Sequence, residues 1–497
     1  NTSRTPDNIT DNPRLQSTND VRLVLIEEGF PNLDLDQSSP LNLATLDLAY
    51  YPSERGPYNL DVAPTGVSAG INSEGELESP GTRWAGIMRG INSTNFEQQN
   101  IEFVQFWMLN PFVGNDDPPD GGDFYINLGS ISEDILKDGQ QAVENGIPTD
   151  GTQQGLDSTR WGFATNVRPP VVAFGNDPNA RDLQDVGYDL IDDEQEENWA
   201  GDPQYSNYLQ RIANSLGQAS QAYQQALEDP FADNFQYYRG DDLDQAGADI
   251  LDRYRYYNNP EGNSDPTAVG GVTAFATNLP DIEDLNQDQT LSKTESYYQY
   301  KVSLRPEDLD EVGKNYITNI TRTTSPEQPD GNQYQAEWIQ FKVPVFNPDK
   351  TVGNIGDFRS IRFIRLFLKN FSQPVVLRFA RMEFVRSEWR RYRFSLDGTR
   401  ERLSQDDQEN TLFEVNAVNI EQNGSRNPIP YVVPPGIDRQ VLFGTTSANQ
   451  QNEQALSLRI LGLEDGDARA VFRNLDFDMR LYKRMKLFTH LESAAET

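Results

Sequence analysis

Apolar residues in this chain fall in short runs that alternate with polar residues and are bounded by Gly, Pro, Asn and Asp. Such runs predict strands of antiparallel sheets rather than repeating helix–strand units. A first group of predicted strands covers residues 21–26, 101–109 and 123–128, and a second group covers 361–368 and 375–385. Each group contains a strand, a turn and another strand, so the two groups look like diverged copies of one unit.

A weaker third group begins at residues 456–461 and continues through 485–488. Repeated strand pairs with long polar insertions predict a mainly β fold, with two to three antiparallel jelly-roll or β-sandwich domains and a small helical insert. We expect four segments: a jelly-roll-like β domain over 1–180, an acidic and helical insert over 181–262, a second β domain over 263–395, and a further, truncated β segment over 396–497.

The strongest helical periodicity runs from about Gln204 to Leu227. One face of this predicted helix carries residues that recur every three or four positions: Tyr205, Leu209, Ile212, Leu216, Ala219, Tyr223 and Leu227. The pair Asp229-Pro230 ends it, and a second short helix is predicted over 243–254. We expect both helices to bury their apolar face against a neighbouring sheet, because the polar face lacks the basic charge of a membrane-surface helix.

Composition narrows the possible functions. The chain has 497 residues, which predicts about three or four domains, and its formal charge is −35, which repels nucleic acid and anionic membranes. The absence of cysteine excludes disulfides, thiolate catalysis and thiolate metal sites. Because of this negative charge, we expect the segment not to bind nucleic acid. No apolar run approaches the ~20 residues of a spanning helix, so we also expect the segment not to cross a membrane.

Residues 359–393 are strongly basic although the whole chain is acidic: they contain ten basic side chains and only two acidic ones. On alternating strand positions the basic residues would form a stripe beside phenylalanines. Such a stripe could bind phosphates while exposed aromatic rings stack on bases. Because the surrounding acid excess cancels long-range attraction of phosphate, we expect instead that the stripe pairs with the acidic insert or with an adjoining domain.

The sharpest chemical motif lies at residues 284–295. Oxygen-bearing residues occupy loop positions 1, 3, 5, 7, 9 and 12, the spacing by which an EF-hand-type loop wraps Ca²⁺: Asp284, Asn286, Asp288, Thr290, Ser292 and Glu295. Gln289 departs from the pattern at position 6, where glycine normally permits the sharp turn. We expect structural calcium here, acting as a brace between domains, although a chain rich in Asp and Asn also produces such spacing by accident.

Three longer motifs carry a family resemblance. Residues 229–264 pack seven aromatics among carboxylates, arginines and turn formers, residues 184–196 form an acidic block, and residues 50–59 read Tyr-Tyr-Pro-Ser-Glu-Arg-Gly-Pro-Tyr-Asn. These motifs resemble the SprA family, the giant outer-membrane translocons of the type IX secretion system and of gliding motility in Bacteroidota. Loops similar to 284–295 occur at the same place in SprA-like sequences. Family members are several times longer than this chain, which therefore looks like a soluble segment of such a protein.

The resemblance implies an outer-membrane protein whose barrel passes folded cargo to the cell surface, with soluble insertions capping the pore. It implies four partners: the rest of the translocon barrel, a PorV-like outer-membrane barrel protein, a periplasmic plug protein and the secreted cargo. We expect this segment to be a non-catalytic cap at the extracellular face that shapes or closes the cargo exit. A position on the periplasmic side is the competing expectation.

Two other function classes stay open. Trp84, Trp107, Trp338 and Trp389 could stack on sugar rings in a surface carbohydrate-binding module, but Trp at strand positions is more often part of the core. Catalysis has little support, because His490 is the single histidine and no nucleophile elbow, phosphate-binding loop or zinc-binding helix is present. Carboxylates are too abundant for any pair to indicate a glycosidase. We expect no enzyme activity.

Overall fold

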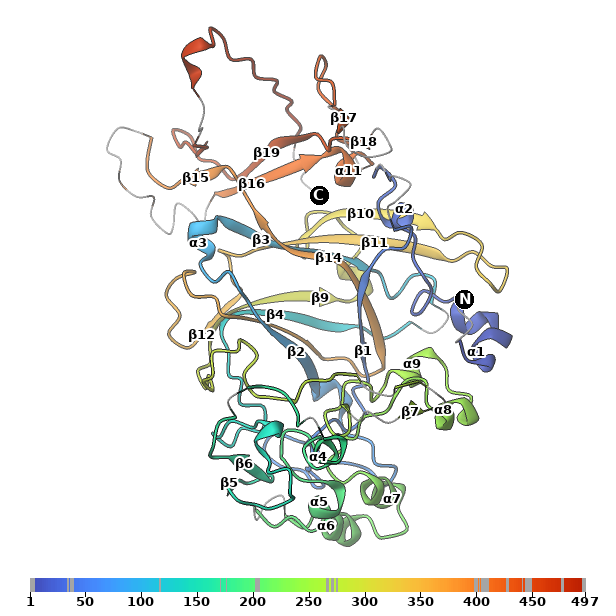
Figure 1. Cartoon of the computed structure of the whole chain (residues 1–497). Helices are drawn as coiled ribbons and strands as arrows, with labels where there is room; N and C mark the ends of the chain where they lie inside the picture. The colour runs from blue at the N-terminus through green and yellow to red at the C-terminus, as the bar shows by residue number, and fades with distance from the viewer. Residues whose placement is uncertain are drawn as a thin grey trace.

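The computed structural model describes the chain except for residues 1–4, 34, 36–39, 116–117, 170, 176, 202–205, 265–267, 270–271, 274–275, 397–400, 402, 404–410, 426–428, 440, 443–448, 475–477 and 494–497. Two five-stranded sheets pack face to face in the middle of the molecule (Figure 1). Neighbouring strands in both sheets are antiparallel. The predicted mainly β fold with an antiparallel sandwich is confirmed.

Strands from distant parts of the chain make up each sheet. The first sheet has the order β1 (Thr45–Tyr50), β14 (Val375–Arg386), β3 (Ile101–Leu109), β11 (Gln335–Pro344) and β10 (Ile317–Thr324). The second has the order β12 (Lys350–Val352), β9 (Ser296–Leu304), β4 (Gly122–Ser130), β13 (Phe363–Lys369) and β2 (Trp84–Gly90). Strands that follow one another in the chain often lie in opposite sheets. This holds for β1 and β2, for β3 and β4, and for β13 and β14.

The two predicted strand groups are interleaved in this sandwich. β3 of the first group pairs with β14 of the second, and β4 pairs with β13. The segments expected to be two β domains, 1–180 and 263–395, therefore share one core. The physical reason is that a lone strand pair leaves unpaired N–H and C=O groups along its edges, and the strands of the other group satisfy them.

Aromatic side chains from both sheets meet in the core. The ring of Phe124 on β4 lies 5.7 Å from that of Phe106 on β3 and 5.2 Å from that of Phe379 on β14. All three rings are buried, and each such side chain stabilises the fold by roughly 1.5–3 kcal/mol relative to an exposed position. Every residue of β3 is buried. One face of the strand meets this core, and Trp107 and Leu109 on the other face pack with the N-terminal segment.

The N-terminal segment covers part of the outer face of the first sheet. It holds α1 (Asp7–Asp11), a 3₁₀ turn (Pro13–Gln16) and α2 (Ile26–Gly29), and it packs Val24 and Phe30 against Trp107 and Trp338. Residues 21–26, predicted as a strand, form only an isolated bridge from Leu25 to Asn42 before α2 begins. Their apolar character comes from covering a sheet rather than from belonging to one.

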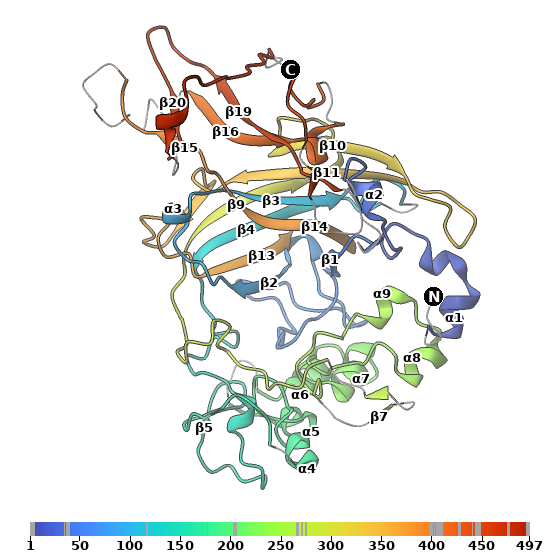
Figure 2. The same cartoon turned by 45° about the horizontal axis from the view of Figure 1, so that its top comes forward.

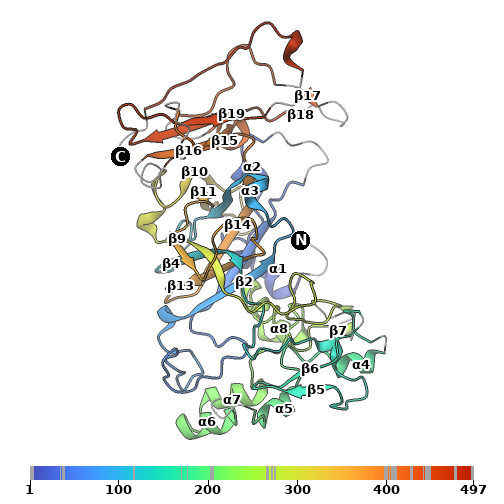
Figure 3. The ribbon, with the colours of Figure 1, turned by 90° about the vertical axis from the view of Figure 1, so that its left-hand side faces the viewer.

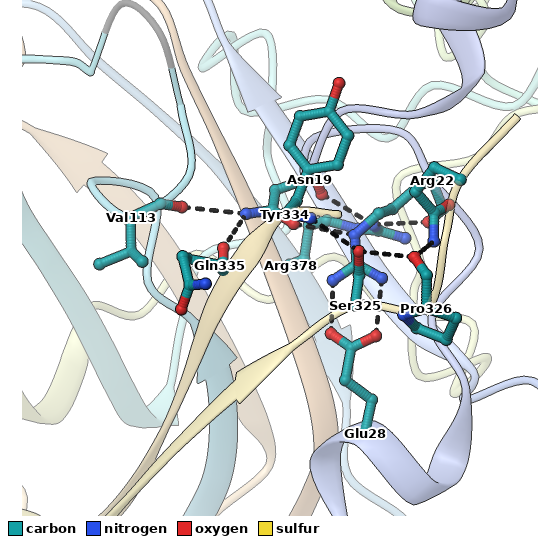
Figure 4. Close-up of polar contacts among 10 residues, drawn as sticks. Asn19, Arg22, Glu28, Val113, Ser325, Pro326, Tyr334, Gln335 and Arg378 are labelled. Atoms are coloured by element: carbon teal, nitrogen blue, oxygen red, sulfur yellow. Dashed lines mark hydrogen bonds and ion pairs between the residues drawn. The ribbon is translucent and has the colours of Figure 1, made fainter. Parts of the chain in front are cut away.

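A buried polar network fixes this segment (Figure 4). Arg22 forms a two-pronged ion pair with Glu28 and donates from Nε to the Asn19 side chain at 2.8 Å. Arg378 of β14 reaches up from the sheet and donates to the carbonyls of Asn19 and Arg22 at 2.9 and 2.8 Å. Asn19 in turn donates to the Gln335 carbonyl of β11, so the network joins the segment to two strands.

A mixed helical body lies on one side of the sandwich (Figures 1 and 3). It contains α4 (Pro178–Asp182), α5 (Asp193–Glu197), α6 (Tyr208–Ser215), α7 (Gln221–Glu228), α8 (Asp241–Ala246), α9 (Ile250–Arg253) and the strand pairs β5 (Leu156–Ser158) with β6 (Phe163–Thr165) and β7 (Ala268–Val269) with β8 (Val272–Thr273). Its core joins the β4–β9 connection to the β1–β2 connection, since Leu60 and Ile71 pack with Tyr208 and Ile212. The body therefore extends beyond the insert predicted at 181–262.

The helix predicted from Gln204 to Leu227 is two shorter helices, α6 and α7. Gly217 follows α6 with a φ of 87°, a left-handed conformation that ends the helix. Tyr208, Ile212, Ala222 and Ala226 form the buried faces, and Gln204 and Tyr205 lie outside the described residues. The helix predicted over 243–254 is likewise divided, into α8 and α9.

The C-terminal segment forms a layer on the opposite side of the sandwich (Figure 2). It contains the pairs β15 (Arg390–Tyr392) with β20 (Ala470–Phe472), β16 (Leu412–Asn419) with β19 (Gln454–Leu461), and β17 (Val441–Leu442) with β18 (Asn449–Gln450). The helix α11 (Ile420–Asn423) follows β16, and the short helix α3 (Phe96–Gln99) precedes β3. Residues 485–488, predicted as a strand, are not in one. Each helix among the described residues is too short or too polar to cross a bilayer.

Candidate functional site

The predicted calcium loop lies beside β13, and its carboxylates already have partners. Asp284 accepts hydrogen bonds from the amides of Asp288 and Gln289 at 3.0 and 2.8 Å. Asp288 pairs with Arg362, and both oxygens of Glu295 lie 3.1 Å from Arg365. The side chains expected at loop positions 1, 5 and 12 are thus held by backbone amides, by Arg365 of β13 and by Arg362 just before that strand.

The other three predicted ligands follow the same pattern. The Asn286 side chain accepts from the Asp288 amide, and the Asp288 carboxylate binds the amide and hydroxyl of Thr290. The Asn286 and Ser292 amides donate to the buried Glu133, at 3.3 and 3.2 Å. Gln289 has a φ of 63°, the left-handed conformation that glycine usually supplies at position 6. The loop has a tight turn, and calcium binding here stays a prediction.

A different set of carboxylates gathers inside the helical body. Oxygens of Asp189, Glu196 and Asp233 lie within 4.8 Å of one another, and all three residues are buried. Asp193 and Glu261, which are half-buried, form an overlapping group with Glu196 under the same distance. Among the described residues, these are the groups of acidic residues close enough to share one metal ion.

The residues of this acidic cluster, Asp189, Asp193, Glu196, Asp233 and Glu261, come from two of the sequence motifs. Residues 184–196 end in α5, whose first turn is capped by the Asp192 side chain accepting from the Gln195 amide. The segment 229–264 supplies the other two members, from the turn after α7 and from the end of the motif. The third motif, 50–59, adds Tyr58, whose hydroxyl accepts from the Tyr188 amide at 3.0 Å.

Backbone hydrogen bonds hold these segments together. The Glu261 amide donates to the Asp233 carbonyl at 3.0 Å, and the Phe235 amide donates back to the Glu261 carbonyl at 2.8 Å. The Gly262 amide reaches the Asp185 carbonyl at 3.0 Å, and the Tyr58 amide reaches Phe231 at 2.8 Å. The acidic side chains are therefore placed by a rigid network rather than by loose turns.

Burial dominates the electrostatics of the cluster. It raises the pKa of Asp189 and Glu196 well above the usual values, and the neighbouring carboxylates raise both further. Burial raises the pKa of Asp233 to about 7, against the opposing effect of the Tyr58 hydroxyl. Burial, followed by the charge of Asp233, raises the pKa of Glu261 to about 10. These directions indicate that the site lacks a compensating positive charge.

The sequence contains a partial signal for this cluster. Residues 184–196 and 229–264 stand out in the sequence as family motifs, but their chemistry is not apparent from spacing. Asp189, Asp193 and Glu196 are four and three residues apart, which resembles one helical face. Only Asp193 and Glu196 lie in α5, however. The other members of the acidic cluster that complete it, Asp233 and Glu261, come from segments distant in the sequence. No local pattern could have brought Glu261 to Glu196.

Two further predictions can be compared with the structure. Within the part of the chain that the structure describes, five arginines of the 359–393 stripe form ion pairs, with Glu97, Asp288, Glu295, Asp47 and Glu102. These acids belong to the sandwich and the 284–295 loop rather than to the 181–262 insert. Trp107 and Trp338 are buried under the N-terminal segment, whereas Trp84 on β2 is 64% exposed and Trp389 is half-buried. The two central Trp residues are core residues.

A protein-family model described as a motility related/secretion protein, SprA_N, matches residues 207–497, more than half of the chain. The chain belongs to the SprA family. The matched region of this SprA-family chain starts at the cap of α6 and contains the 229–264 motif, the 284–295 loop and strands β9 to β14. The 50–59 and 184–196 motifs lie before it. No curated protein matches the chain.

Proposed function

We propose that this chain is a non-catalytic segment of an outer-membrane protein-secretion translocon, located at the extracellular face, where it shapes or closes the cargo exit. The observation that carries the proposal is the match to a motility and secretion family over residues 207–497. Its partners are the rest of the translocon barrel, a PorV-like outer-membrane barrel protein, a periplasmic plug protein and the secreted cargo.

The architecture supports a mechanical role. From the facing strand orders β1-β14-β3-β11 and β2-β13-β4-β9 we infer a jelly roll, in which strands distant in the chain pair side by side. Such a unit resists deformation, because pulling apart distant segments of the chain would break the hydrogen bonds between central strands of a sheet. A rigid block of this kind suits a cap that folded cargo must pass without disordering it.

We also propose structural calcium at the 284–295 loop, as its residue spacing predicts. Binding there requires Asp288 and Glu295 to exchange Arg362 and Arg365 for the ion. Asp288→Ala and Glu295→Ala should each abolish a calcium-dependent rise in melting temperature assigned to the loop. A calcium response of unchanged size in both variants removes the loop from consideration.

The carbohydrate-binding alternative loses two of its four candidate stacking residues, whereas Trp84, which is 64% exposed, and the half-buried Trp389 remain candidates. Trp107 and Trp338 are 1% and 0% exposed, so neither presents a ring face to a sugar. Replacing either with alanine would open a cavity in the core rather than remove a stacking platform.

The deciding experiment is affinity capture of the tagged native protein from outer-membrane extracts, with mass spectrometry of the captured chain and its partners. Recovery of a much longer chain with a small outer-membrane barrel protein or secretion cargo supports the translocon role. Recovery of a chain that ends near Thr497, alone, contradicts it. Protease treatment of intact cells then separates the two faces: cleavage within this segment supports the extracellular position, and protection until the outer membrane is opened supports the periplasmic one.

A further inference from the structure

We propose that Asp189, Glu196 and Asp233 bind one buried Ca²⁺ ion. Asp193 and Glu261 complete the ligand shell from the rim of the site. The site is separate from the 284–295 loop and shares none of its residues. It does not depend on the side of the membrane that the segment occupies or on the cargo, so it goes beyond the proposed function.

The distances suit a single calcium ion. Ca²⁺ binds oxygens at 2.3–2.6 Å, so two ligands on opposite sides of one ion lie about 5 Å apart. The carboxylate oxygens of Asp189, Glu196 and Asp233 are within 4.8 Å of one another, and those of Asp193, Glu196 and Glu261 meet the same limit. The ligand atoms are oxygens throughout, which favours a hard cation over zinc or copper.

The carboxylate oxygens that face the cluster accept no hydrogen bond from neighbouring protein groups. Oδ2 of Asp189 and Oε1 of Glu196 accept no hydrogen bond, although the two residues are 0% and 1% exposed. Asp233 is also 0% exposed and lies beside Tyr58, but neither of its oxygens accepts a hydrogen bond of normal geometry. A buried polar atom without a partner is costly, and a metal ion is one of the few groups that satisfies several at once.

Buried carboxylates elsewhere in the same molecule are treated differently. Glu144 accepts from the Gly187 and Asp281 amides, and Glu283 accepts from the amides of Ile135, Leu136 and Ala142. Both side chains are buried, at 0% and 1% exposure, and each has N–H donors on both oxygens. Glu144 and Glu283 are thus surrounded by amides, whereas the carboxylates of the cluster leave their inward oxygens without hydrogen-bond donors.

Outer contacts orient the ligands. The Phe231 amide donates to Oε2 of Glu196 at 3.0 Å, which leaves Oε1 pointing to the cluster, and the Asn234 side chain donates to Asp193 at 3.0 Å. Gly187 has a φ of 77°, and a side chain there would begin 2.7 Å from Oδ2 of Asp233. In metal sites, hydrogen bonds of this kind to the ligand side chains fix their orientation toward the ion.

A shared proton is the competing explanation, since two adjacent carboxylates can hold one proton between them. It leaves the third carboxylate of the central group charged in a dry site, which costs several kcal/mol per ion. A divalent cation neutralises more of the group and ties residues 184–196 to 229–264. The ion would act as a structural clamp whose binding energy contributes to folding.

The test uses the complete 497-residue chain, stripped with a chelator and titrated with calcium chloride. Melting temperature and bound metal, measured by elemental analysis after gel filtration, are the readouts. We expect the melting temperature to rise with added calcium. We also expect the cluster of each chain to retain one calcium ion through gel filtration. Asp233→Asn and Glu196→Gln should lose that ion and weaken calcium binding by at least ~10-fold. The same variants should melt at a higher temperature than the unmutated chain when both are metal-free, because each removes a carboxyl group whose ionisation in the buried cluster is unfavourable.

Two controls locate the effect. Glu144→Gln changes a buried carboxylate that has amide partners, and it should keep the calcium response. Asp288→Ala, in the 284–295 loop, should also keep the ion of the cluster. The proposal is overturned if the unmutated chain neither retains calcium nor gains stability from it, which would indicate a shared proton. It is also overturned if Asp233→Asn and Glu196→Gln bind calcium like the unmutated chain, or if Asp288→Ala alone abolishes binding.

Discussion

Lys342 on β11 is a basic side chain placed where its charge is disfavoured. Burial lowers the pKa of its ammonium group from 10.5 to about 8, and the carboxylates of Glu383 and Glu414 offset only part of this effect. Gln105 of β3 lies opposite it in the sheet. The side chain therefore couples the stability of the sandwich to pH in the alkaline range.

Lys342→Met should flatten that dependence. Between about pH 8 and 10.5 the unfolded chain holds a proton on Lys342 that the folded protein has lost, so the stability of the unmutated chain rises with pH across this window. Below pH 8 both states are protonated and the folded state carries the full penalty, so the methionine variant should be the more stable. Urea midpoints of the two proteins, measured from pH 7 to 10.5, should converge. Parallel curves would contradict the assigned pKa.

The buried pair of Arg22 and Glu28 makes a second prediction at this scale. Their side chains are 0% and 2% exposed, so Glu28→Gln leaves an uncompensated guanidinium in the interior and should cost about 3–5 kcal/mol of unfolding free energy. The exposed pair of Arg359 and Glu97 is the control, and Glu97→Gln should cost less than ~1 kcal/mol. Equal losses in the two variants, measured by chemical denaturation, would show that the network does not hold the N-terminal segment.

Among the elements, the start of β4 depends on the absence of a side chain. A Cβ on Gly122 would lie 2.4 Å from the ring of Phe371, which is 1% exposed and has no room to move. We expect Gly122→Ala to destabilise the sandwich by roughly 1–3 kcal/mol through overpacking. Gly356→Ala adds the same methyl group where nothing lies within 4 Å. A melting temperature lowered in both variants would point to backbone flexibility instead of the Phe371 contact.

Element prediction from the sequence succeeded where one physical signal dominated. The strands predicted at 101–109 and 375–385 match β3 and β14 to within one residue, because long aromatic and β-branched runs have few other structures available. The helical stripe of 204–227 was interrupted by Gly217, whose backbone conformation outweighs the periodicity around it. Residues 21–26 are apolar because they cover a sheet, and burial alone does not specify a strand.

Over the whole molecule, the sequence could not predict which strands pair. Paired strands such as β4 and β13 are separated by more than two hundred residues. The hydrophobic pattern of each predicted group is equally compatible with a sheet of its own and with a sheet shared between the groups. The acidic cluster was missed for the same reason, since Glu196 and Glu261 meet only through the fold of the body. The predicted calcium loop was visible because its residues are contiguous, which is also why its spacing alone is weak evidence.

The interleaved topology predicts that the family-matched region does not fold alone. A fragment of residues 207–497 lacks β1, β2, β3 and β4. β13 pairs with β2 and β4, and β14 pairs with β1 and β3, so both strands would lose every sheet partner and expose the core rings that they carry. We expect this fragment to aggregate, or to show no cooperative melting by circular dichroism and rapid proteolysis.

A fragment of residues 1–396 keeps all ten strands of the sandwich and is the matched comparison. It loses the C-terminal layer, but the sheet face that it uncovers includes polar groups: Asn319 and Gln340, both of which donate to Gln422, are buried beneath that layer. Water can replace those hydrogen bonds, so removal of the layer should lower the melting temperature without abolishing the cooperative transition. If residues 207–497 instead form a monomer that unfolds cooperatively while 1–396 does not, the unit of folding follows the family boundary, and the sandwich is not the framework that holds the rest of the chain.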